Sequence, residues 1–375
     1  MAGIYLHIPY CRSKCHYCDF YATSNVSSIE KLVESEKREL IARKQYIGNE
    51  IVETIYFGGG TPSVLSAFQV KALLEVINAN FIVASDCEIT LEANPEDLAE
   101  PYLTALRLAG INRMSIGIQS FNNEMLSYLG RGHDNSKLVN KIRAVQKAGI
   151  GNISIDLIYG IPGLSLDNYS DSLKEAMNLG IQHISAYSLI IEKNTFFYNL
   201  YKTNRLKEAP DDDVVAQFNM TIDTLASYGF SHYEVSSFAL EGFKSRHNSS
   251  YWEGKKYLGV GPSAHSFDGI SRQWNVSSIK NYILNIEGDK DYFEIEILSE
   301  VDRYNEYLLV GLRTAKGISK HYISEHFNSK INSYFLKELS KLNSEEFISV
   351  TVDRVTLTRK GIFVSDLIIR SLFFN

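Results

Sequence analysis

Four segments of the chain repeat one order of residue types, and this repeat constrains the fold more than any other feature. In residues 106–117, 145–156, 176–187 and 225–236, a helical pattern ends at a glycine and a short apolar run begins a few residues later. Glycine readily takes the left-handed conformation that closes a helix. The apolar runs are typical of strands with both faces buried. The repeat therefore predicts a parallel α/β architecture.

The same alternation extends over the first two-thirds of the chain. We predict strands at residues 3–9, 53–58, 88–93, 113–119, 152–158 and 183–189, and a further strand at 232–237. We predict helices at 29–46, 66–80, 96–109, 136–148, 167–179 and 212–228. No Gly-x-Gly-x-x-Gly string follows a strand, which argues against a doubly wound dinucleotide fold. A closed or partly open barrel of parallel strands fits the pattern better.

The last part of the chain has a different pattern. It predicts a helix at 300–318, two more helices, a hairpin at 347–358 that turns at Asp353-Arg354, and a final helix at 360–374. This order resembles a winged-helix module. Residues 300–375 carry 11 Lys and Arg against 9 Asp and Glu, which argues against a nucleic-acid partner. We predict a barrel at 1–240, a linking region at 241–299 and a C-terminal domain at 300–375.

Three of the four cysteines lie in one loop after the first predicted strand, at Cys11, Cys15 and Cys18. Thiols with such spacing usually hold metal. Zinc would need a fourth ligand, for which His7, His16 or Cys87 is available. An iron–sulfur cubane would use the three thiolates and leave one iron open to another ligand. Three ordinary buried thiols are the remaining alternative. We expect Cys87 to be a core residue.

Polar residues follow or end several of the predicted strands. Gly58-Gly59-Gly60-Thr61-Pro62 follows the second strand, Glu92 ends the third, Gln119 ends the fourth, and Asp156 lies in the fifth. Functional groups of parallel barrels gather at the C-terminal ends of strands. Polar groups on apolar strands are costly without partners, so several on one rim indicate a ligand.

The segment Tyr5–Cys18, YLHIPYCRSKCHYC, resembles the signature of radical S-adenosylmethionine (SAM) proteins. It is most similar to the branch that contains oxygen-independent coproporphyrinogen III oxidase and its heme-chaperone relative, and the similarity extends to residues 357–361 and 365–366. The resemblance implies an α/β fold, a partial (β/α)6 radical SAM barrel with a smaller C-terminal helical domain. It implies a [4Fe–4S] cluster on Cys11, Cys15 and Cys18. It also implies SAM contacts at Tyr5, Tyr17, Gly59, Gly60, Thr61, Glu92, Gln119, Arg131, Asp156 and Ile158.

Two features distinguish the branches of this family. The oxidase has a further cysteine two residues after the third cluster ligand, where this chain has Phe20. The string His247-Asn248-Ser249-Ser250-Tyr251-Trp252 matches that of the heme-chaperone branch. Neutral imidazole is a normal heme ligand, so we predict heme contacts at His247, Asn248, Tyr251 and Trp252 in a loop near the rim. His265 is a second candidate ligand. A structural, hydrogen-bonded His247 is the alternative.

These features predict a heme chaperone that carries a [4Fe–4S] cluster and SAM and delivers heme to acceptor proteins, membrane respiratory enzymes among them. The alternative is an oxidase that decarboxylates propionate side chains of coproporphyrinogen III by radical chemistry. Either function needs an electron donor. The N-terminal segment lacks the pattern of a signal peptide, and no apolar run is long enough for an integral membrane span. We therefore expect a cytoplasmic protein, peripheral at the membrane when it delivers heme.

Overall fold

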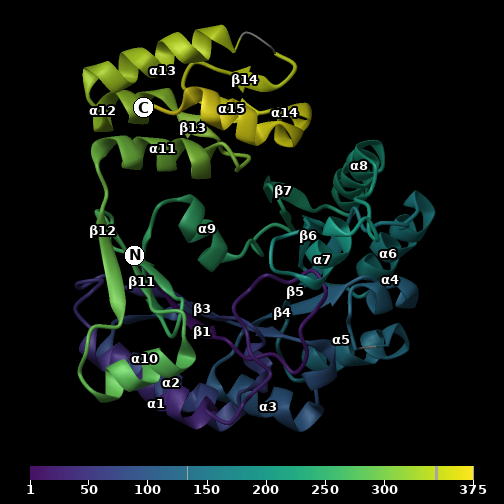
Figure 1. Cartoon of the computed structure of the whole chain (residues 1–375), viewed down its shortest axis with the longest axis vertical. Coiled ribbons are helices and arrows are strands. Elements are labelled where there is room, and N and C mark those ends of the chain that lie inside the picture. Colours follow the sequence, from purple (N-terminus) through teal and green to yellow (C-terminus); the bar gives the residue numbers. More distant parts are fainter. Residues whose placement is uncertain (133, 343–344, 375) are drawn as a thin grey trace.

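A computed structural model describes residues 1–132, 134–342 and 345–374. Its centre is a 12-stranded sheet in which six parallel strands lie side by side in chain order (Figure 1). These strands are β1 (Ala2–Ile8), β2 (Val52–Gly59), β3 (Val83–Ala93), β4 (Arg113–Gln119), β5 (Asn152–Tyr159) and β6 (His183–Ser188). All six predicted barrel strands are confirmed, and their order is that of a partial (β/α)6 barrel.

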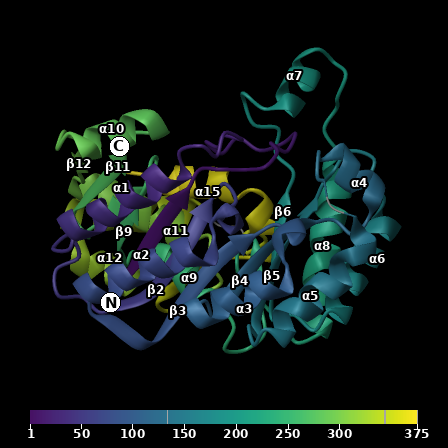
Figure 2. The ribbon, with the colours of Figure 1, turned by 90° about the horizontal axis from the view of Figure 1, so that it is seen from below.

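Helices that follow these strands cover the convex face of the curved sheet (Figure 2). They are α1 (Ile29–Ala42), α2 (Ala67–Asn80), α3 (Glu100–Ala109), α5 (Leu138–Lys147), α6 (Leu166–Asn178) and α8 (Asp211–Ser227), with the short α4 (Asn123–Tyr128) and α7 (Phe196–Lys202) in loops. The four glycines of the repeated unit, Gly110, Gly149, Gly180 and Gly229, all have positive φ angles, of 117°, 84°, 66° and 84°. The repeat therefore marks real helix ends.

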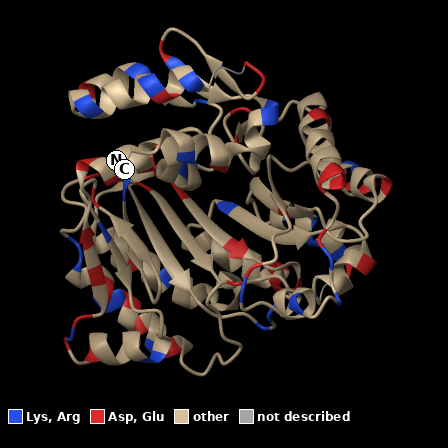
Figure 3. Ribbon diagram, turned by 45° about the horizontal axis from the view of Figure 1, so that its top comes forward, with Lys and Arg blue, Asp and Glu red and all other residues tan. Residues whose placement is uncertain are grey.

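The two faces of the parallel strands differ in polarity, whereas the sequence pattern predicted strands that are apolar on both faces. The convex face carries Ile and Leu side chains that pack under the helices. The concave face carries fully buried polar residues: Thr90 pairs in register with Arg113, and Ser154 pairs with His183. Charged residues gather on the surrounding helices and loops, and few lie on the central strands (Figure 3). The barrel interior is therefore lined by buried polar side chains, with Arg113 among them.

The sheet continues on both sides of the six strands. Beyond β1 lie β9 (Lys256–Val260), which is parallel to β1, and then the antiparallel β10 (His265–Phe267), β11 (Ser271–Asn275) and β12 (Phe293–Ile297). Beyond β6 lie β8 (Ser237–Ala239) and β7 (Ser231–Glu234). Much of the expected linking region 241–299 thus belongs to the main sheet, together with α9 (Arg246–Trp252) and α10 (Ile279–Glu287).

The C-terminal part has a hydrophobic core of its own. Its elements are α11 (Glu300–Gly311), β13 (Ile318–Ser319), α12 (Lys320–His326), α13 (Ser329–Lys341), β14 (Ile348–Val350), β15 (Arg354–Leu357), α14 (Arg359–Phe363) and α15 (Ser365–Leu372). The helix expected at 300–318 ends at Gly311, and the one expected at 360–374 is two helices separated at Val364. The expected hairpin is present, but its turn lies at 351–353 rather than at Asp353-Arg354.

This part bridges the two sides of the open barrel (Figure 1). On one side, Glu306 of α11 forms an ion pair with Arg272 of β11, with Nε and Oε1 2.5 Å apart. On the other side, the Val235 amide beside β7 donates to the Arg313 carbonyl oxygen over 2.9 Å. The segment from α11 to Arg313 thus connects β11, next to one edge of the sheet, with β7 at the other edge. Within the described residues, no helix is both long and apolar enough to cross a membrane.

Candidate functional site

The cysteine loop lies at the C-terminal end of β1, where the loops of the other parallel strands also end. Its start and end are held together, because the Cys11 amide donates to the Thr23 carbonyl oxygen over 3.0 Å and the Thr23 amide donates to that of Pro9 over 2.9 Å. The three predicted ligands, Cys11, Cys15 and Cys18, are unpaired thiols that are each partly exposed. The loop therefore presents reactive sulfur at the rim of the barrel.

The glycine-rich turn after β2 packs directly against this loop. The Thr61 amide donates to the Tyr10 carbonyl oxygen over 2.7 Å, and the Thr61 hydroxyl donates to the Cys11 thiol sulfur over 3.3 Å. A Cβ atom at Gly60 would lie 2.7 Å from the Tyr10 carbonyl oxygen, which is too close. The position therefore requires glycine, and the string that could have been an ordinary turn holds the first cysteine in place.

Arg131 joins the cysteine loop to the third and fourth strands. Its Nη1 donates to Cys15 Sγ over 3.3 Å, and its Nη2 donates to Asn94 Oδ1 over 2.9 Å and to the Gly117 carbonyl oxygen. A Cβ atom at Gly117 would lie 2.9 Å from Nη2. Among the described residues, the Arg131 Nε is buried without a hydrogen-bond partner. Arg131 thus lies beside the cysteine loop, in the position expected of an anion contact.

His16 fixes the middle of the cysteine loop. Its amide donates to the Leu129 carbonyl oxygen over 3.0 Å, and its Nδ1 is 2.9 Å from the Tyr128 carbonyl oxygen. A Cβ at Gly130 would lie 2.8 Å from its ring. From the sequence, His16 was considered only as a metal ligand. In the structure its hydrogen bonds instead hold the cysteine loop next to Arg131.

The three thiols fit a cluster better than a single metal ion. In the described ranges 1–132, 134–342 and 345–374, no three His, Cys, Asp or Glu side chains converge on a point where one ion could be held. Zinc needs such convergence, with sulfur at about 2.3 Å. A cubane does not, because each thiolate binds a different iron. Burial, followed by the neighbouring Cys15 and Cys11, raises the pKa of Cys18 to about 11, so the thiols are electrostatic neighbours.

Two carboxyl groups point from the concave face into the barrel below the loop. Burial is the main cause that raises the pKa of Glu92 to about 7 and that of Asp156 to about 6. The Tyr56 hydroxyl donates to Glu92 Oε1 over 2.7 Å. These carboxyls can accept hydrogen bonds from ligand hydroxyls and can hold a proton near neutral pH. Arg113, whose Nε and Nη1 are buried without partners, lies within electrostatic range of both.

The other residues predicted to contact SAM lie around the same rim, except Tyr5, whose ring stacks deeper in the barrel on those of Tyr56 and His247. Tyr5 stacks on Tyr56 with ring centroids 6.1 Å apart, and burial raises the pKa of Tyr17 beside Arg131. Gln119 ends β4 with a positive φ angle of 70°, which turns its side chain at the rim. Gly59 also has a positive φ, and Ile158 is buried two residues beyond Asp156 on the same strand face. The structure therefore brings the predicted set together. Sequence reasoning missed Asn94, Gly117 and Arg113 as members of this region.

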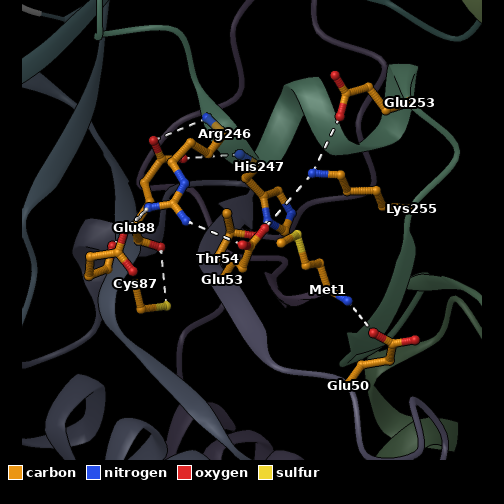
Figure 4. Close-up of polar contacts among 11 residues, drawn as sticks. Met1, Glu50, Glu53, Thr54, Cys87, Glu88, Arg246, His247, Glu253 and Lys255 are labelled. Atoms are coloured by element: carbon orange, nitrogen blue, oxygen red, sulfur yellow. Dashed lines mark hydrogen bonds and ion pairs between the residues drawn. The ribbon is translucent and has the colours of Figure 1, made fainter.

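The string at residues 247–252 does not lie at this rim. It forms α9, which packs against the beginnings of β1 and β2, away from the cysteine loop (Figure 4). The His247 ring extends into the barrel and stacks on those of Tyr56 and Tyr5, with ring centroids 4.9 and 6.3 Å apart. The amides of Arg246 and His247 donate to the Glu88 carboxylate over 3.1 and 3.0 Å. The prediction of a rim loop is therefore wrong. Cys87, buried next to Glu88, lies at this far end as well and is not near the other thiols.

His247 is fully occupied where it lies. It is 1% exposed, its Nδ1 is 2.8 Å from the Thr54 hydroxyl, and its Nε2 is 2.8 Å from the Tyr251 hydroxyl. Burial, and then Arg113, lower the pKa of His247 to about 3, so the ring is neutral. Neither ring nitrogen is free for iron. Tyr251 is occupied by the same contact, while Asn248 and Trp252 are half-buried on α9. The structural alternative for His247 is the one this geometry supports.

Comparison with known proteins gives the family. Residues 5–176 match the model of the Radical SAM superfamily, and residues 298–364 match that of the HemN C-terminal domain. The Heme chaperone HemW of Bacillus subtilis is 34% identical and is aligned over 96% of this chain and 96% of its own length. The chain belongs to the radical SAM family, in the heme chaperone HemW group.

Two other matches extend this result. The HemW protein of Lactococcus lactis is 33% identical over 95% of this chain and 93% of its own length. The mouse mitochondrial radical S-adenosyl methionine domain-containing protein 1 is 30% identical over 99% and 87%. Among solved structures, the coproporphyrinogen III oxidase HemN of Escherichia coli superposes with a TM-score of 0.85 at 22% identity, over 99% of this chain and 90% of that one. The last match confirms the predicted fold class.

Proposed function

We propose that this protein is a heme chaperone, which binds heme and transfers it to acceptor hemoproteins, and that it carries a [4Fe–4S] cluster and SAM at the barrel rim. The observation that carries the proposal is the likeness to curated heme chaperones over nearly the whole chain. The rim supports the cofactor part of the proposal, because thiols outside any disulfide, the Arg131 guanidinium and two inward carboxyls meet there.

Each residue at the rim has side-chain chemistry suited to one part of the cluster or of SAM. Cys11, Cys15 and Cys18 hold the cluster, which supplies one electron to bound SAM when it is reduced. Arg131 binds the SAM carboxylate, since a guanidinium matches a carboxylate in charge and shape. Glu92 and Asp156 accept from ribose hydroxyls, and the glycines at 59 and 60 let the ligand approach the backbone. Tyr5, Tyr17, Thr61, Gln119 and Ile158 complete the pocket.

The partners follow from this function. We propose heme as cargo, acceptor hemoproteins that include membrane respiratory enzymes, and a separate protein as electron donor. We place the protein in the cytoplasm, peripheral to the membrane during delivery. We also propose that the chain divides into a barrel at residues 1–240, a linking region at 241–299 and a C-terminal domain at 300–375.

The alternative is decarboxylation of coproporphyrinogen III by the same cofactors. The likeness to the oxidase of Escherichia coli concerns the fold alone. Phe20, which stands where the oxidase has its additional cysteine, is 63% exposed and offers apolar surface instead of a thiol. We therefore prefer the chaperone.

The test compares the two reactions on one preparation. The full chain is reconstituted anaerobically with iron and sulfide, then loaded with heme and mixed with apomyoglobin. In parallel it is incubated with SAM, dithionite and coproporphyrinogen III. We expect heme transfer to apomyoglobin at a rate different from that of free heme, and no decarboxylated product. Sustained decarboxylation, or failure to bind heme at all, would contradict the proposal.

A further inference from the structure

His265 differs from the other histidine that the sequence suggests for heme. It opens β10 and is exposed, whereas His247 is buried. Within the part of the chain that the structure describes, its ring has no hydrogen-bond partner. Its pKa is lowered by burial of part of the ring and then by Arg272, so the imidazole is neutral at pH 7. His265 therefore offers a free, neutral nitrogen.

Strand register places His265 on the concave face of the sheet. Tyr5, which points into the barrel, pairs with Gly259 of β9, and Gly3 pairs with Tyr257. Tyr257 pairs with Phe267 of β10, so Phe267 and His265, two residues apart, share that face. His265 in turn pairs with Trp274 of β11. The imidazole and the indole thus lie on the extension of the barrel's inner surface.

Two glycines bring His265 to the end of the sheet that holds the cysteine loop. A Cβ at Gly259 would lie 1.9 Å from the His265 carbonyl oxygen, so the chain crosses directly over β9 there. A Cβ at Gly261 would lie 2.7 Å from the carbonyl oxygen of His7, four residues before Cys11. His265 is also within electrostatic range of the His7 ring. The turn between β9 and β10 is therefore pressed against the strand that leads into the cysteines.

The surface around His265 is aromatic and open. The Trp274 ring is 6.3 Å from that of His265 at 34°, and it is only half-buried. On the cysteine loop, Phe20 and Tyr21 are 63% and 43% exposed, and the Tyr21 hydroxyl accepts from the amide of Ile279 at the start of α10. Farther down the same face, Tyr257 and Phe267 are covered by α9 and α11. Beside the cysteine loop, His265 is exposed and Trp274 is half-buried.

We infer that His265 supplies the imidazole ligand to heme iron and that the porphyrin lies against Trp274, beside the cysteine loop. The inference rests on the proposed function, and it names the site at which the cargo is held. A neutral imidazole with a free nitrogen is what heme iron takes from a protein, and a flat indole gives apolar area to the macrocycle. Heme would then lie at the same end of the barrel as the cluster.

The test is a titration of the full chain with ferric heme, followed by absorption and electron paramagnetic resonance spectra. We expect His265→Ala to bind heme at least about tenfold more weakly and to lose the spectrum of an imidazole-ligated iron. Added imidazole should restore that spectrum in the variant, because the ligand site is open. His321→Ala is the matched control, since His321 is also exposed, with 71% of its side chain accessible, but lies on α12.

The outcomes separate the inference from the function on which it rests. If the wild-type protein binds no heme, the proposed function fails. If the wild-type protein binds heme and His265→Ala gives the same affinity and spectrum, the function stands and the assignment of His265 is overturned. Loss of the imidazole spectrum in His265→Ala, with wild-type behaviour in His321→Ala, supports the assignment.

Discussion

The two ends of the barrel use similar residue types in opposite ways. At the end closed by α9, His247 has partners on both ring nitrogens and Glu88 accepts from two amides. At the other end, three thiols lie outside any disulfide, Arg131 Nε and His7 Nε2 have no hydrogen-bond partner among the described residues, and the His265 ring is exposed. The difference shows that a match to a sequence string does not leave a histidine free to bind a ligand, because both ring nitrogens of His247 are already hydrogen-bonded.

The largest effect is expected when a cysteine of the loop is replaced. Cys15→Ser should lower bound iron after anaerobic reconstitution from about four atoms per chain to nearly none, because a hydroxyl replaces an essential thiolate. Cys87→Ser is the matched control at the closed end, and it should retain the iron. Iron and acid-labile sulfide analysis measures both variants. Equal iron in the wild type and Cys15→Ser would show that this loop does not hold the cluster.

The next effect concerns the closed end. His247→Ala removes a buried ring and leaves the hydroxyls of Thr54 and Tyr251 without their partner. We expect the free energy of unfolding to fall by about 3 kcal/mol, since a cavity and unpaired polar groups are created together. Denaturant unfolding measures this loss, with His321→Ala as the control. A fully stable His247→Ala protein that no longer binds heme would reverse our assignment of the two ends.

Much of the rim was predictable from the sequence, because its residues follow directly on strands that the repeated pattern locates. Register then determines that Glu92 and Asp156 face the same side, and the Cys11–Cys18 spacing places three thiols in one loop. The location of residues 246–252 was not predictable. A short polar helix between two glycine-containing turns has the sequence pattern of a loop. Its position at the beginnings of the strands depends on long-range contacts with Thr54 and Glu88.

The roles of Asn94 and Gly117 were hidden for a related reason. Both act through Arg131, which is 37 and 14 residues away in the chain. Likewise, β9–β12 are short strands whose alternation is weak, and they are stabilised by pairing with β1 and with one another. Sequence patterns report local periodicity, whereas these contacts arise only once the sheet has formed.

A smaller effect tests how the rim holds its ligand. Arg131→Lys keeps the charge but loses the planar group that reaches Cys15, Asn94 and the Gly117 carbonyl together. We expect SAM to bind about tenfold more weakly to the reconstituted protein, with iron content retained. Equilibrium dialysis with labelled SAM measures the affinity. Arg12→Lys is the control, because the Arg12 side chain is 64% exposed and pairs with Asp97, away from Arg131. Equal SAM affinity in the wild type and Arg131→Lys would exclude Arg131 as a SAM contact.

The smallest effect is a pH dependence from the inward carboxyls. Burial raises the pKa of Glu92 from 4.5 to about 7, so the folded state holds a proton that the unfolded state releases. The stabilisation from Glu92 is therefore present below about pH 4.5 and is lost as the pH rises through about 7. Glu92→Gln should flatten the fall in the free energy of unfolding of the cluster-free protein over this pH range by about 1 kcal/mol, as measured by denaturant unfolding. An unchanged slope would show that another group titrates.

The most direct test of the difference between the two ends is hydrogen–deuterium exchange of the protein with and without ferric heme. We predict that heme slows exchange in residues 18–23 and 262–276, next to the cysteine loop, and leaves residues 245–255 unchanged. Slower exchange confined to residues 245–255 would contradict the account, because heme would then bind at the end that α9 closes.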